Sequence, residues 1–111
     1  MEYLQAVKVI FNLLGGQRFL LMTQSSIFYG KNKENKPYLK FSLPDNLSKG
    51  NRINSFIVSY GNSKGLFNIS FISTQNSKNF IIDEINQVNA EDILPIFEQE
   101  TGFTFCSLGP N

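Results

Sequence analysis

The sequence contains no histidine and a single cysteine, Cys106. Without histidine, the Ser–His and Cys–His arrangements that activate nucleophiles cannot form, and most zinc sites lose their ligands. One cysteine excludes an internal disulfide and any zinc site built on several cysteines. Cys106 stands among apolar residues near the end of the chain, which favours a packed or free thiol over a nucleophile. We therefore expect no metal and no other cofactor.

Long apolar runs and glycine-rich nucleotide motifs are missing as well. No stretch approaches the ~20 apolar residues that a membrane-spanning helix requires. Gly15-Gly16 is too short for a phosphate-binding loop, and neither G-x-G-x-x-G nor a P-loop occurs. Glu2 stands where a signal peptide carries basic residues, so the helical start is expected to be part of the fold. The sequence thus predicts a soluble, cytoplasmic protein without membrane contact.

Basic residues are absent from residues 81–111, which hold six acids. Residues 1–80 hold all ten lysines and arginines and three acids. The net charge of +1 is therefore the sum of a basic segment, residues 1–80, and an acidic segment, residues 81–111. Two interpretations remain open: the acidic segments lie beside basic loops and neutralise them, or a basic face is available to an anionic partner.

The length and apolar content predict one domain over residues 1–111. The chain is 41% hydrophobic and contains eleven Phe and four Tyr, which is enough to form a core. Residues 2–14 have the three- and four-residue spacing of an amphipathic helix, which Gly15-Gly16 would end. Residues 19–22 are four consecutive apolar residues, and we expect them to form a short strand buried on both faces.

Alternating apolar and polar residues predict further strands up to about residue 88, with a bulge near 83–84. Asn89 can cap a final helix, which Pro95 permits if the regular helix starts near Asp92. The expected strands cover residues 27–29, 38–43, 53–60, 66–73 and 80–87. The predicted fold class is therefore α+β: an N-terminal helix, an antiparallel meander sheet of five or six strands and a C-terminal helix, with the helices packed on one sheet face.

This pattern assigns residues to a core and to an opposite sheet face. The expected core consists of Phe19, Leu21, Phe41, Val58, Ile69, Phe71, Phe97 and the apolar side of residues 7–11. The expected opposite face consists of Tyr38, Lys40, Ser42, Asn54, Ile57, Asn68 and Ser70.

Two terminal segments carry a resemblance to a family. One is Leu14-Gly15-Gly16-Gln17-Arg18-Phe19-Leu20-Leu21-Met22-Thr23, and the other contains Val88-Asn89-Ala90-Glu91-Asp92 followed by Phe97-Glu98-Gln99-Glu100-Thr101-Gly102. They resemble a Leu-Gly-Gly-x-(Lys/Arg)-Phe-x-x-Met-Thr segment and the closing acidic helix of small proteins encoded by bacteriophages, prophages and conjugative elements. The resemblance implies an origin in a mobile element rather than a mechanism.

No residue pattern indicates catalysis. The neighbouring acids Asp83-Glu84, Glu91-Asp92 and Glu98/Glu100 are typical of solvated surface or of the first turn of a helix. Acid–base or two-metal chemistry would need acids that converge in a cleft. We therefore expect that the protein is not an enzyme.

Two binding functions remain. The first is contact with another protein, or self-association as a homo-oligomer, through the open sheet face with Tyr38, Lys40 and Ile57. The alternative is binding of single-stranded nucleic acid by the hairpin 28–40, because aromatic and basic side chains alternate there. Its residues are Phe28, Tyr29, Lys31, Lys33, Lys36, Tyr38 and Lys40.

Overall fold

The computed structural model describes residues 3–31, 33–43, 53–61 and 65–102. Cys106 and the last phenylalanines lie outside this range. Within these residues, five strands form one antiparallel sheet in the order β1-β2-β3-β4-β5. The elements follow one another as α1 Tyr3–Leu13, α2 Gln17–Thr23, β1 Ser26–Lys31, β2 Pro37–Ser42, β3 Ser55–Tyr60, β4 Leu66–Gln75, β5 Lys78–Asn89, the 3₁₀ turn η1 Ala90–Asp92 and α3 Ile93–Thr101.

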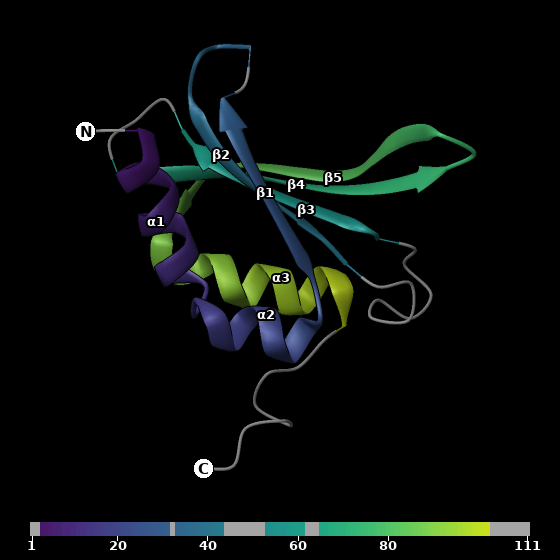
Figure 1. Ribbon diagram of the computed structural model, residues 1–111. Helices are drawn as coiled ribbons and strands as arrows, with labels where there is room; N and C mark the ends of the chain where they lie inside the picture. The colour runs from purple at the N-terminus through teal and green to yellow at the C-terminus, as the bar shows by residue number, and fades with distance from the viewer. Residues whose placement is uncertain (1–2, 32, 44–52, 62–64, 103–111) are drawn as a thin grey trace.

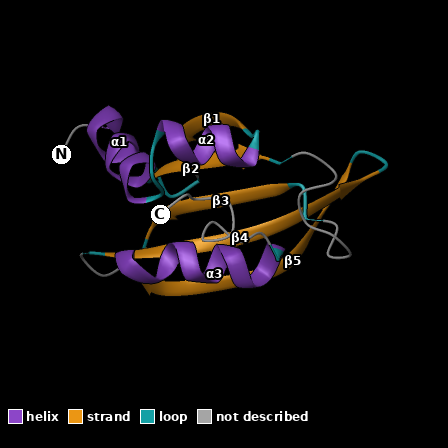
Figure 2. Cartoon of the chain, turned by 90° about the horizontal axis from the view of Figure 1, so that it is seen from below, coloured by secondary structure: helices purple, strands orange, loops and turns teal. Residues whose placement is uncertain are grey.

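The described helices α1, α2 and α3 lie on one face of the sheet (Figure 1). Seen from that side, α2 lies over β1 and β2, whereas α3 runs along β4 and β5 (Figure 2). The opposite face of the sheet carries no helix in the described part of the chain. The predicted α+β class and the placement of the helices on one face are confirmed.

Residues 17–23 form helix α2, so the strand expected at 19–22 is wrong. Gly15 and Gly16 have φ values of +108° and +60°, a region that glycine adopts without steric cost. They end α1 and turn the chain directly into α2. Four apolar residues fit a buried helix as well as a strand, because periodicity alone does not separate the two over so short a run.

Helix α2 buries only one of two residues that the expected strand would have buried together. Phe19 is 1% exposed, but Leu21 is 76% exposed, so the expected core position of Leu21 is also wrong. Residues two apart on a helix point in different directions. Thr23, one turn after Phe19, is buried, and its hydroxyl donates a hydrogen bond to the Phe19 carbonyl at 2.7 Å.

A row of phenylalanines forms the centre of the core. Phe41, Phe56 and Phe71 are direct cross-strand partners on β2, β3 and β4, with neighbouring ring centroids 5.8 and 5.1 Å apart. Phe19 of α2 lies 4.9 Å from Phe41, and Phe97 of α3 lies 4.9 Å from Phe56. The helices thus close the same aromatic row from two sides. The other expected core residues Val7, Val58 and Ile69 are also buried.

Helix α1 packs at one end of this core. Its apolar stripe buries Val7 and Ile10, as the spacing predicted. The Tyr60 hydroxyl on β3 donates a hydrogen bond to the Ala6 carbonyl at 3.3 Å, and burial raises the pKa of Tyr60. In the described residues, no helix has the length and apolar character needed to cross a bilayer.

Strand β5 is irregular, as expected, but at different residues. Asp83 pairs with Phe71 and Ile81 with Ile72, which leaves Ile82 as an extra residue. A second shift lies between residues 85 and 88, where Gln87 has a φ of +59°. An extra residue changes which side chains face each side of the sheet. The bulge predicted near 83–84 therefore lies one residue earlier.

The C-terminal helix α3 starts at a residue that places Pro95 in its first turn. Pro95 is the third residue of α3, within the first turn, where its missing N–H costs no helical hydrogen bond. Asn89 precedes η1 but makes no side-chain capping bond, contrary to expectation. Gly102, with φ +79°, ends the helix and donates its N–H to the Glu98 carbonyl at 2.8 Å, as the sequence predicted.

Candidate interaction surface

The sheet face opposite the helices, called the open face below, is defined by the strand register. Directly paired residues on neighbouring strands point to the same side. The central cross-strand row is Phe28, Lys40, Ile57, Ser70 and Glu84. On one side of it lies the row Ser26, Ser42, Ser55, Ile72 and Ile81, and on the other side the row Gly30, Tyr38, Ser59 and Asn68.

Large apolar side chains stand among small polar ones on the open face. Phe28 is 54% and Ile81 63% exposed, and Ile57 and Ile72 are half-buried. By the register, Lys40 and Glu84 are the charged residues among the three described rows. Exposed apolar patches mark contact sites, and the centres of protein interfaces are poor in charge and rich in aromatic residues. The composition of the open face fits protein contact.

The three residues expected to contact a partner lie together. Lys40 pairs directly with Ile57, and Tyr38 stands two residues before Lys40 on the same face. The Tyr38 ring lies against Gly30 on β1, since a Cβ on Gly30 would stand 3.0 Å from the Tyr38 hydroxyl oxygen. A side chain at position 30 would crowd the Tyr38 ring, so glycine leaves room for it. Tyr38, Lys40 and Ile57 are all half-buried.

The open face also differs from its expected composition. The period of two puts Ser55 rather than Asn54 beside Ile57; Asn54 precedes β3, and its side-chain oxygen accepts a hydrogen bond from the Thr74 N–H. Ile72 and Ile81 pair on the open face and were missed. For Ile72 the alternation along β4 was a sufficient signal. For Ile81 the position of the bulge had to be known.

The residues of the alternative nucleic-acid site divide between the two sides of the sheet. Phe28, Tyr38 and Lys40 lie on the open face, whereas Tyr29 pairs with the fully buried Leu39 and so belongs to the helix side. Stacking of successive bases needs aromatic rings on one platform. The register therefore removes Tyr29 from any platform that Phe28 and Tyr38 form.

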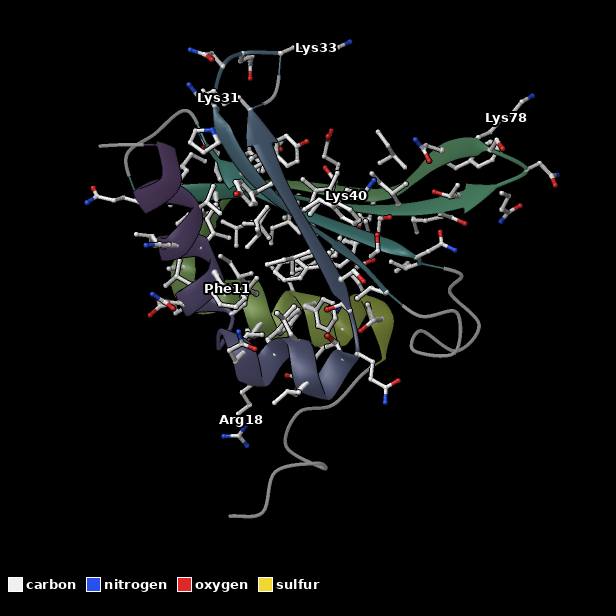
Figure 3. The ribbon with its side chains drawn as sticks, in the orientation of Figure 1. Phe11, Arg18, Lys31, Lys33, Lys40 and Lys78 are labelled. Atoms are coloured by element: carbon white, nitrogen blue, oxygen red, sulfur yellow. The ribbon has the colours of Figure 1, made fainter. Side chains whose placement is uncertain are left out.

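Basic side chains are spread over the molecule (Figure 3). Lys31 and Lys33 lie at the end of the β1–β2 hairpin, Lys78 lies at the tip of the β4–β5 hairpin, and Arg18 points away from the sheet. Lys36 directly precedes β2. A continuous basic stripe is the usual electrostatic feature of nucleic-acid-binding surfaces, and these described residues do not form one.

Comparison of the chain with protein-family models, with curated proteins and with solved structures finds no significant match. A functional assignment therefore depends on the residues themselves and on their arrangement in the fold.

Acids that are adjacent in the sequence separate in the structure. Asp83 pairs with the core residue Phe71, whereas Glu84 pairs with Ser70 on the open face. Asp83 instead meets Glu100 of α3. Burial, followed by the hydrogen bond to Asp83 and its negative charge, raises the pKa of Glu100. In the part of the chain that the structure describes, no three His, Cys, Asp or Glu residues are grouped as metal ligands.

The Asp83–Glu100 contact predicts a pH-dependent stability. A folded-state pKa above the ordinary value of 4.5 means that Glu100 favours folding below about pH 4.5 and that this contribution is lost as pH rises through the raised pKa. Glu100→Gln removes the ionisation. We expect the variant to have a slightly higher unfolding temperature than the wild type at neutral pH, and the difference to vanish on acidification.

Thermal unfolding of both proteins at several pH values measures this difference. Glu91→Gln is the control, because Glu91 lies in η1 at the start of the helical segment, where a negative charge is favourable. It should not raise stability. A Glu100→Gln protein less stable than the wild type at neutral pH would contradict the contact.

Proposed function

We propose that this chain is a small non-enzymatic binding protein that acts by protein–protein contact through the open face of its sheet. One observation carries the proposal: the sheet face that no described helix covers exposes Phe28 and Ile81, and it also carries Ile57 and Ile72, with few charges. Burial of such apolar surface drives association. The resemblance of the terminal segments to proteins of phages and conjugative elements supports an accessory role in a mobile element.

The double variant Tyr38→Ala/Ile57→Ser tests the proposal. Both side chains lie on the open face, away from the phenylalanine core, so we expect the fold to be kept, with a modest fall in the unfolding temperature from the loss of two half-buried side chains. Removal of an aromatic and an aliphatic contact from the centre of the face should weaken self-association or partner capture by tenfold or more, about 1.4 kcal/mol or above. Sedimentation velocity measures self-association, and pull-down measures partner capture.

A matched control removes apolar surface from the helices, on the other side of the sheet. Val9 and Leu21 are exposed on α1 and α2, and Val9→Ala/Leu21→Ser should leave association unchanged. Full association of the Tyr38→Ala/Ile57→Ser protein would contradict the proposal. Binding of single-stranded DNA that weakens steeply with salt, and that is lost when Lys31, Lys33 and Lys36 are neutralised, would replace it by the nucleic-acid function.

A further inference from the structure

We propose that the open face binds a second copy of this chain, in a face-to-face dimer in which Lys40 of each copy pairs with Glu84 of the other. The inference rests on the proposed function, because it names the partner of the same surface. It is carried by the positions of the two charges and by the distribution of large and small side chains around them.

The two charges share one cross-strand row. Lys40 lies on β2 and Glu84 on β5, with Ile57 and Ser70 between them. At about 4.8 Å per strand, the two backbone positions are roughly 14 Å apart, too far for a direct ion pair within one copy. The Ser70 hydroxyl donates a hydrogen bond to Glu84 Oε2 at 3.4 Å, which draws the carboxylate over the open face towards β4.

A twofold axis satisfies both charges at once. If the axis runs along the strands, between β3 and β4, it brings each Lys40 over Glu84 of the second copy. Two equivalent ion pairs then form, as an isologous interface requires. An axis across the strands at the same row would instead set Lys40 over Lys40 and Glu84 over Glu84. Like charges opposite one another cost free energy, so the charges select the first arrangement.

The uncharged side chains fit the same arrangement. Ile57 then faces Ser70 of the second copy. Ile81 in turn faces Ser42 of the second copy. A large side chain thus meets a small one at each of these positions, which is how facing layers interdigitate without voids. Two sheets packed in this way form an aligned sandwich.

The dimer is expected to be reversible. With the axis between β3 and β4, strands β2 to β5 of the two copies face one another. Four strands at about 4.8 Å and six residues at about 3.4 Å give a facing area of roughly 19 by 20 Å. This area is below the roughly 800 Å² per partner of a standard stable interface. Its ion pairs contribute specificity and alignment more than affinity. Association is therefore best measured over a wide range of protein concentrations.

Charge reversal tests the alignment by sedimentation equilibrium. Lys40→Glu or Glu84→Lys alone makes all four facing charges alike, and each variant should dimerise about tenfold more weakly than the wild type. An equimolar mixture of the two variants should form a heterodimer at wild-type strength, since each copy then meets the opposite charge. The double variant Lys40→Glu/Glu84→Lys should restore the homodimer. Lys8→Glu and Glu91→Lys change the net charge equally away from the open face and should have no effect.

The outcomes separate this inference from the proposed function. If each single reversal dimerises like the wild type, or if the mixture fails to associate, the proposed alignment is wrong. If the wild type stays monomeric while Tyr38→Ala/Ile57→Ser still abolishes capture of a different protein, the second copy is wrong and the contact function stands. If neither self-association nor capture depends on the open face, both proposals fail. Circular dichroism of each variant confirms folding, and Glu84→Gln provides a milder substitution.

Discussion

Phe71→Ala is expected to lower the free energy of unfolding by about 3–5 kcal/mol. Phe71 is fully buried on β4, and its ring lies 5.1 Å from that of Phe56 in a stacked arrangement. The substitution removes apolar burial and also leaves a cavity in the middle of the aromatic row. Packed strands on both sides of β4 limit how far the surroundings can collapse into that space. Urea unfolding at a fixed protein concentration measures the loss.

Phe80→Ala is the matched control for Phe71→Ala. Phe80 lies on β5 in the β4–β5 hairpin and is 49% exposed, so the same substitution should cost less than about 1 kcal/mol. A loss below about 1 kcal/mol for Phe71→Ala itself would mean that β4 is out of register.

Phe19→Ala should destabilise the protein by a similar amount, about 3–5 kcal/mol. Its ring lies 4.9 Å from that of Phe41 and 5.2 Å from that of Phe97, and it is the residue by which α2 enters the aromatic row. Leu21→Ala should cost less than about 0.5 kcal/mol, because Leu21 is 76% exposed.

The pair of variants distinguishes the helix from the strand that the sequence favours. A strand buried on both faces would make Phe19→Ala and Leu21→Ala comparably costly. A helix makes only Phe19→Ala costly. Equal losses in urea unfolding of the two variants would therefore contradict α2.

The strands could be predicted because alternation over six or more residues has few explanations. Phe67, Ile69 and Phe71 recur at every second position, and the structure buries all three. Residues 19–22 form too short a run for such a test, and they become a helix because Gly15-Gly16 turns the chain back onto the sheet. The decisive information at that point is tertiary packing, which local propensity does not contain.

The contact between Asp83 and Glu100 could not be predicted from the sequence pattern. An extra residue at Ile82 determines that Asp83 faces the helices, and the path of α3 determines what Asp83 meets. Tyr38, Lys40 and Ile57, by contrast, were placed together from alternation alone. The open face was therefore predictable on β2 and β3, but only partly on β5, where the bulges interrupt the period.

Isoleucine-methyl NMR of the wild type over a dilution series tests most directly whether the open face contacts a protein. Protein contact changes the environment of methyl groups on the open face but not of those in the core. We predict concentration-dependent shifts for Ile57, Ile72 and Ile81, and constant shifts for Ile10, Ile69 and Ile93. If the protein forms no homo-oligomer, the same three methyl groups should shift when a captured partner is added. Constant shifts for Ile57, Ile72 and Ile81 under both conditions, or shifts confined to the helix side, would contradict the account.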